Sequence, residues 1–150
     1  MTEKGLLFDV FPPLAFTVYC KPEPQGSSKA FIPKGWKRPI ITSDNRELKS
    51  YRQQVSVVAL AEMRKAGLVP IDSKHRVRLT ARFYFQRPKS KKKASPMVTR
   101  PDLDKLLRAV GDALSKGICY GDDSQVTSFG DSEKLYGEPE RTEITIEAIP

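Results

Sequence analysis

The sequence predicts one α/β domain, a sandwich in which a mixed sheet of about four strands carries two main helices. Two stretches, 46–66 and 102–116, repeat apolar residues at the three- and four-residue spacing of a buried helical face. Other stretches alternate apolar and polar residues, as half-buried strands do. The chain has 150 residues and no internal repeat, which suits a single domain over 1–150 with its own core.

The expected elements follow from local patterns taken in chain order. Pro12 and Pro13 end a loosely held extension, and Gly67 ends the first helix, for which Ser43 or Asp44 is the expected cap. Gly117 is the expected C-cap of the second helix, which begins after Pro101. The predicted order is an extension over 1–14, a strand over 15–21, a long basic loop over 22–45, a helix over 46–66, a strand over 76–86, a basic loop over 87–101, the second helix, and closing strands over 125–134 and 141–149.

The composition excludes several classes of protein. With 39% hydrophobic and 29% charged residues, the chain is typical of a globular protein, and no apolar run is long enough to span a membrane. Glu3 and Asp9 interrupt the N-terminal stretch, so it does not resemble a signal peptide, and we expect a cytoplasmic protein. Cys20 and Cys119 have no metal-site spacing, and His75 is the single histidine, so a zinc site is not expected.

The formal net charge of +8 is distributed unevenly along the chain. Residues 1–101 contain 21 Lys and Arg against 7 Asp and Glu, whereas residues 102–150 contain 5 against 11. A basic body attracts the phosphate backbone of nucleic acid, and an acidic centre within it can hold a cation against that backbone.

The stretch 102–123 carries the candidate chemistry. Asp102 and Asp104 flank the start of the second helix, Asp122 and Asp123 follow it in a Gly-Asp-Asp turn, and Arg108 lies one turn after Asp104. Mg²⁺ prefers such hard oxygen ligands together with phosphate oxygens, an arrangement suited to phosphodiester cleavage. Each acid also has a structural interpretation, as a helix cap, a first-turn acid or a turn residue, and these alternatives stay open.

Three short motifs in this stretch resemble the RusA family of Holliday-junction resolvases. They are Asp-Leu-Asp-Lys at 102–105, Asp-Ala-Leu at 112–114 and Asp-Asp-Ser-Gln-Val at 122–126, and their spacing fits the family pattern without a gap. The resemblance implies that Asp102, Asp104 and Asp123 bind the metal, and we expect Asp122 to contribute as an outer-shell partner. Arg108 stands where the family usually has a catalytic lysine, and Lys105 stands where it usually has asparagine.

The same resemblance implies a Mg²⁺-dependent homodimeric endodeoxyribonuclease, with Mn²⁺ as an alternative cofactor, encoded by a bacterium or phage. Its substrate would be a four-way DNA junction, cut by paired symmetric nicks during recombination and repair. Two alternatives remain: a non-enzymatic DNA-binding protein with the same fold, and a nuclease that acts on flaps or other branched DNA.

Basic residues of the two long loops, one aromatic residue and one lysine of the second helix are the predicted DNA contacts. A long loop with basic and aromatic residues interleaved suits a nucleic-acid surface, although Trp36 packed on the core is an equally weighted alternative. The predicted set comprises Lys29, Lys34, Trp36, Lys37, Arg38, Arg87, Lys89, Lys91, Lys92, Lys93, Arg100 and Lys105.

Overall fold

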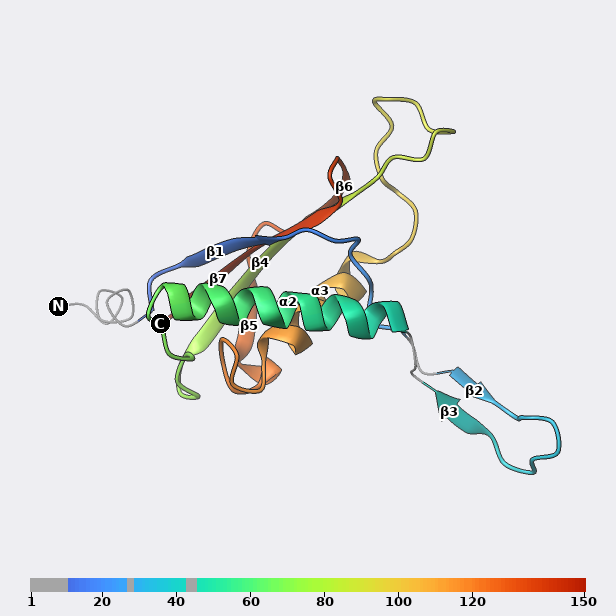
Figure 1. The fold of residues 1–150 in the computed structure, drawn as a ribbon, viewed down its shortest axis with the longest axis horizontal. Coiled ribbons are helices and arrows are strands. Elements are labelled where there is room, and N and C mark those ends of the chain that lie inside the picture. The colour runs from blue at the N-terminus through green and yellow to red at the C-terminus, as the bar shows by residue number, and fades with distance from the viewer. Residues whose placement is uncertain (1–10, 27–28, 43–45) are drawn as a thin grey trace.

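A computed structural model describes residues 11–26, 29–42 and 46–150, which form a two-layer α/β sandwich with a small separate hairpin (Figure 1). Two helices, α2 and α3, pack on one face of a five-stranded sheet. The predicted fold class is therefore confirmed, with one more strand in the sheet than expected. The elements are β1 (Leu14–Val18), β2 (Lys29–Phe31), β3 (Ile40–Thr42), α2 (Arg46–Lys65), β4 (Arg76–Phe85), α3 (Leu103–Leu114), the 3₁₀ turn η1 (Asp123–Gln125), β5 (Val126–Phe129), β6 (Glu133–Tyr136) and β7 (Arg141–Ile149).

Strand β4 is the centre of the sheet. It pairs antiparallel with β7, which pairs antiparallel with β1, and its other edge carries β5 and β6, both parallel to it. The single strand predicted over 125–134 is thus wrong, because the chain breaks between β5 and β6. Gly130 lies against the Thr80 side chain, where any Cβ would clash, and the Ser132 hydroxyl accepts a hydrogen bond from Ala81 N, at 3.0 Å.

The alternation in β4 separates a core face from a solvent face. Val77, Leu79, Ala81 and Phe83 are fully buried toward the helices. On the other face, arginines of β4 pair with acids of neighbouring strands: Arg78 with Glu147 at 3.7 Å and Arg82 with Glu133 at 3.6 Å. Those arginines therefore belong to a solvated, charge-paired sheet face.

The helices close the core through their apolar stripes and two polar links. Tyr51 of α2 is buried, and its hydroxyl lies 2.6 Å from that of Thr142 in β7. The Ser56 hydroxyl donates to the Ala113 carbonyl at 2.7 Å and so joins α2 to α3. The buried residues of α2 are Leu48, Tyr51, Val55, Ala59 and Met63.

Several predicted boundaries differ from the structure. Phe11 is buried and Leu14 begins β1, so the extension predicted over 1–14 is wrong from residue 11 onward, because these apolar side chains join the core. Helix α3 ends at Leu114, three residues before Gly117, which instead takes a left-handed φ of 87° in the turn that follows. The predicted extension over 1–10 and the expected caps at 43–44 lie outside the described residues.

The predicted long loop over 22–45 contains a β-hairpin, formed by β2 and β3, that projects from the body (Figure 1). The second basic loop, 87–101, is irregular as predicted and projects from the same end of the molecule. Within the described ranges, no helix combines the length and the apolar character needed to cross a bilayer.

Candidate active site on helix α3

The start of α3 presents two exposed carboxylates. Asp102 occupies the N-cap position in an extended conformation, but its side chain makes no capping hydrogen bond. Asp104 follows in the first turn, where the helix dipole favours negative charge, and both side chains face solvent. Lys105 Nζ lies 3.8 Å from Asp102 Oδ2. The capping interpretation of Asp102 is therefore wrong, and its oxygens are available to a ligand.

The exposed stripe of α3 continues from these acids along the helix. Asp104, Arg108 and Asp112 succeed one another at four-residue spacing, opposite the buried leucines. Among the described residues, Arg108 makes no ion pair with Asp104. The Arg108 guanidinium is left facing solvent beside the carboxylates.

The Gly-Asp-Asp turn after α3 is held in place by Gln125. The buried Gln125 Oε1 accepts hydrogen bonds from Gly121 N at 2.9 Å and Asp122 N at 3.1 Å. Its Nε2 donates to the carbonyls of Asp72 at 2.9 Å and His75 at 3.1 Å, in the segment that leads into β4. The conformation of the turn is thus fixed to the sheet by one side chain that uses its full hydrogen-bonding capacity.

The two aspartates of this turn differ in role. Asp122 Oδ1 accepts a hydrogen bond from Ser124 N at 2.9 Å and caps η1. This bond is the main reason that the pKa of the Asp122 carboxyl is lowered. The pKa of Asp123 is raised, first by its hydrogen bond with the Asp122 carboxyl, then by burial, and then by the charge of Asp112. Asp123 therefore lies in a concentration of negative charge that a cation would relieve.

Asp112 is a neighbour of Asp123 that the sequence did not assign to the site. It lies on the last turns of α3, eight residues after Asp104, which is about 12 Å along a helix axis. Asp112 Oδ2 is also 3.8 Å from Arg52 Nη1 of α2. The sequence could have indicated Asp112 through its four-residue spacing from Arg108, because that spacing places Asp112 on the same exposed stripe of the helix as Asp104.

The carboxylates thus form two groups, one at each end of α3. Asp102 and Asp104 lie at its start, whereas Asp123 lies with Asp122 and Asp112 near its end. In the described part of the chain, no group of three or more His, Cys, Asp or Glu side chains is close enough to hold a metal ion. Joint coordination by Asp102, Asp104 and Asp123 therefore stays a prediction. The donors themselves are exposed hard oxygens in a region of mutual repulsion, and this chemistry fits a divalent cation such as Mg²⁺.

Lys134 of β6 fixes the segment that enters α3. Its Nζ donates to the Thr99 carbonyl at 2.6 Å and to the Pro101 carbonyl at 2.9 Å. These two acceptors immediately precede Asp102, so Lys134 ties the position of the first carboxylate to the edge of the sheet. Nothing in the local sequence around Lys134 indicated this long-range contact.

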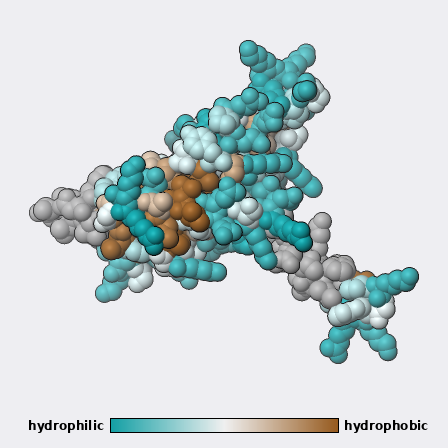
Figure 2. Space-filling view, in the orientation of Figure 1, coloured by the Kyte–Doolittle hydropathy of each residue, from teal (hydrophilic) through white to brown (hydrophobic). Residues whose placement is uncertain are grey.

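The predicted DNA contacts lie mainly on the two projections, which are hydrophilic in Figure 2. In the 87–101 loop, Lys89, Lys91, Lys92, Lys93 and Arg100 are exposed. Arg87 differs from them: it is half-buried, with its guanidinium carbon 5.2 Å from the centre of the Tyr136 ring. Arg87 therefore supports the base of the loop.

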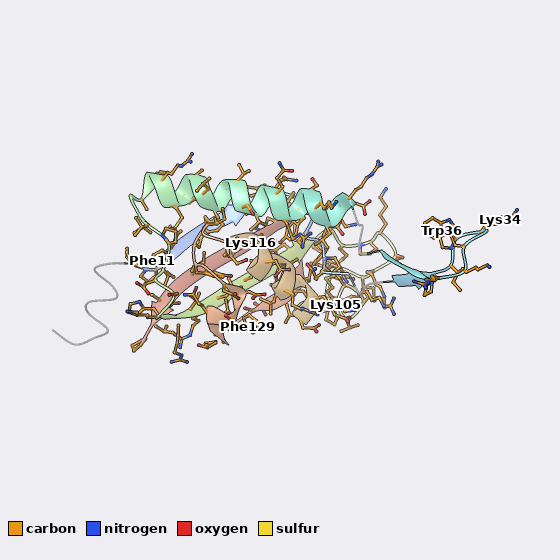
Figure 3. The ribbon with its side chains drawn as sticks, turned by 90° about the horizontal axis from the view of Figure 1, so that it is seen from below. Phe11, Lys34, Trp36, Lys105, Lys116 and Phe129 are labelled. Carbon is orange, nitrogen blue, oxygen red and sulfur yellow. The ribbon has the colours of Figure 1, made fainter. Side chains whose placement is uncertain are left out.

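The other projection, the β2–β3 hairpin, begins beside α3. Gln25 N donates to the Lys105 carbonyl at 2.9 Å, and Gln25 Oε1 accepts from Arg52 Nη1 at 3.3 Å. Lys34, Trp36, Lys37 and Arg38 are exposed at its tip, and Lys29 lies in β2. Trp36 packed on the core, the alternative interpretation, is therefore wrong. In Figure 3, Lys34 and Trp36 extend away from the body, and Lys105 lies between them and Lys116.

Comparison with known proteins places these observations in context. The family described as Endodeoxyribonuclease RusA matches residues 21–147, which include both projections, α3 and most of the sheet. The chain is also similar to a Bacillus subtilis (strain 168) protein named "Uncharacterized protein YqaN". The two are 32% identical over 143 residues, which cover 91% of this chain and 96% of the relative.

Proposed function

We propose, because this chain belongs to the RusA family of endodeoxyribonucleases, that it resolves four-way DNA junctions by paired symmetric nicks. The observation that carries the proposal is the pair of exposed carboxylates at the start of α3, Asp102 and Asp104, set in a protein of net charge +8. A surface that only binds DNA gains nothing from carboxylates beside its basic loops, since they repel phosphate unless a cation lies between them.

The proposed metal ligands are Asp102, Asp104 and Asp123, with Asp122 in the outer coordination sphere. Family nucleases depend on a divalent metal, and Mg²⁺ is the proposed ion here, with Mn²⁺ as a substitute. When bound, the ion supplies Lewis acidity toward the scissile phosphodiester. The carboxylates orient it, and Gln125 and Lys134 hold the two segments from which they project.

Arg108 is the proposed phosphate ligand of the protein itself. Its planar guanidinium binds two phosphate oxygens at once and stabilises the charge that develops on them. Arginine stays protonated at all working pH values, so it does not deliver a proton to the leaving oxygen. That proton therefore comes from solvent or from Lys105, whose ammonium is within 3.8 Å of Asp102.

The two basic projections are proposed to hold the DNA backbone on either side of α3. Their exposed lysines and arginines replace condensed counterions on phosphates, so binding should weaken steeply with salt. Two symmetric nicks need two active sites related by a two-fold axis, which is the reason to propose a homodimer as the working form. We place its action in a bacterial or phage-infected cytoplasm, where recombination intermediates carry such junctions.

The test is cleavage of an end-labelled synthetic four-way junction beside a linear duplex of matched sequence. Wild type and Asp104→Asn are compared with Mg²⁺, with Mn²⁺ and with EDTA, and binding is measured separately by a gel-shift assay. Paired nicks on the junction alone, lost with EDTA and with Asp104→Asn while binding persists, are the expected result. A flap and a three-way junction in the same series distinguish junction cleavage from the alternative nuclease activity.

One observation favours a second candidate, a DNA-binding protein without activity. Arg108 and Lys105 occupy positions where the family usually has lysine and asparagine. Under this alternative, wild type binds the junction tightly but cuts nothing with either metal, and Asp104→Asn binds at least as tightly because a repulsive charge is gone.

A further inference from the structure

The tip of the β2–β3 hairpin has the form of a projecting pin. The two strands pair antiparallel from Lys29↔Thr42 to Phe31↔Ile40. The tip between them is closed by a hydrogen bond from Trp36 N to the Pro33 carbonyl at 3.0 Å, with Gly35 at a φ of 86°. Only glycine adopts this left-handed conformation without strain, so the turn that presents Trp36 is built into the sequence.

The described apolar side chains of the tip are exposed. Trp36 is 59% exposed and Ile32 is 63% exposed, and Figure 3 shows Trp36 at the far end of the hairpin. Trp36 is also the only tryptophan in the chain. A large, mostly exposed aromatic side chain on a projection, with no hydrogen-bond partner among the described residues, indicates a contact surface.

The charge around Trp36 selects the kind of partner. Lys34, Lys37 and Arg38 flank it and are exposed, and residues 29–42 contain no acid. An apolar protein groove would have to strip water from these cations without compensating them. A nucleic acid supplies both partners at once, because phosphates pair with the cations and a base offers its π-face to the indole ring.

The hairpin also begins next to the candidate active site. Gln25 precedes β2, and its backbone N donates a hydrogen bond to the Lys105 carbonyl on the first turn of α3. Trp36 lies eleven positions after Gln25 in the sequence, and a fully extended chain of that length spans at most about 40 Å. At roughly 3.4 Å per nucleotide step along a DNA strand, this upper limit keeps Trp36 within about twelve steps of a phosphate held at α3.

We propose that the β2–β3 hairpin is a DNA pin whose Trp36 stacks on an unpaired or opened base at a branch point. The inference rests on the proposed function for the presence of branched DNA, but it concerns recognition and not cleavage. A base inside a continuous duplex is already stacked on both faces. A branch point offers open faces, so the pin contributes to the preference for branched over linear DNA.

The single tryptophan allows a direct test, because stacking on a base quenches indole fluorescence. Wild-type protein in EDTA is titrated with a four-way junction, a single strand and a linear duplex, and binding is followed in parallel by the anisotropy of labelled DNA. We expect strong quenching by the junction and the single strand and little by the duplex. A 2-aminopurine placed at the opened base should be less fluorescent when bound to wild type than when bound to Trp36→Ala, because stacking on the indole ring quenches it.

Variants separate stacking from charge. Trp36→Ala should weaken junction binding about 5- to 150-fold, the usual range for removing one stacked aromatic side chain, with a much smaller effect on duplex. Trp36→Phe should recover part of this loss. Phe129→Ala is the matched control, since Phe129 is an aromatic residue 56% exposed on β5, away from the hairpin, and its removal should leave binding unchanged.

The outcomes distinguish this inference from the proposed function. Junction binding and cleavage with no tryptophan quenching, and with Trp36→Ala equal to wild type, overturn the pin and leave the nuclease standing. Quenching without cleavage in Mg²⁺ or Mn²⁺ supports the pin and overturns the nuclease. A blue shift with phosphatidylserine vesicles but no response to any DNA would assign the tip to a membrane surface and overturn the pin.

Discussion

Replacing Gln125 with alanine tests whether one buried side chain fixes the turn that carries Asp122 and Asp123. The substitution removes four hydrogen bonds, two accepted from the turn and two donated to carbonyls before β4. It removes no other hydrogen bond of the turn, such as that from Ser124 N to Asp122 Oδ1. Among the described residues, no other side chain is hydrogen-bonded to these four groups, so the loss of the four bonds should both destabilise the fold and free the turn to move.

The magnitude follows from the bonds and their exposure. Each intramolecular hydrogen bond contributes about 0.5–1.5 kcal/mol net, so four bonds set a range of about 2–6 kcal/mol. Gly121, Asp122 and Asp72 are exposed, so their backbone groups regain water when the side chain is gone. We therefore expect Gln125→Ala to lower the free energy of unfolding by about 2–4 kcal/mol. For a domain of this size, the middle of that range, about 3 kcal/mol, lowers Tm by about 6–12 °C.

Urea unfolding followed by circular dichroism at 222 nm measures this change in free energy. Tryptophan fluorescence is not suitable, because Trp36 lies on the hairpin and does not report on the core. Gln53→Ala is the matched control: Gln53 is an exposed residue of α2, and its removal should change stability by less than about 0.5 kcal/mol. If Gln125→Ala costs no more than Gln53→Ala and cleaves junctions at the wild-type rate, the turn is held by other contacts and the reasoning is refuted.

Three further predictions concern the active site and the thiols. Lys134→Ala should slow junction cleavage at least tenfold while junction affinity stays within about twofold of wild type, because the contact that positions Asp102 is lost. Lys134→Arg should recover part of the rate. A change in affinity alone would contradict this positioning role. Arg108→Lys should raise the cleavage rate at least tenfold, since lysine can both bind phosphate and donate a proton, whereas Arg108→Ala should lower it; equal rates for all three would remove Arg108 from the mechanism. Burial raises the pKa of the Cys119 thiol to about 12, so only about one thiol in ten thousand is ionised at pH 8. In the native protein, Ellman's reagent should therefore react with the half-buried Cys20 alone, and with Cys119 only after unfolding. Rapid reaction of two thiols in the native state would contradict this assignment.

Local periodicity was sufficient for the elements that build the core. The alternation in β4 and β7 and the apolar stripes of α2 and α3 recur every two residues or every three to four, and these periods are properties of the chain itself. The same local patterns placed Asp102 and Asp104 at a helix start and Asp122 and Asp123 in a turn. All of these features depend on residues close together in sequence.

The sequence patterns did not predict the boundaries of secondary-structure elements where those boundaries depend on contacts with residues distant in the chain. The break between β5 and β6 is made by the approach of Gly130 to Thr80, fifty residues earlier, and the local sequence does not contain that contact. The β2–β3 pairing was missed for a related reason, because the Pro-rich and basic composition of residues 29–42 resembles that of an irregular loop, although these fourteen residues fold back on themselves.

By itself, the sequence determined the fold class, the family and the residue types of the site, because periodicity, composition and motif spacing are all written along the chain. The tertiary structure alone decided which carboxylates are neighbours: Asp123 lies with Asp112 near the end of α3, and the Asp102 side chain makes no capping hydrogen bond at the start. It also decided that Gln125 and Lys134 hold the two segments that carry the carboxylates and that Trp36 is presented to solvent. The physical reason is that hydrogen bonds and charge repulsion act over a few ångströms in space, and packing determines which residues of a chain come within that distance.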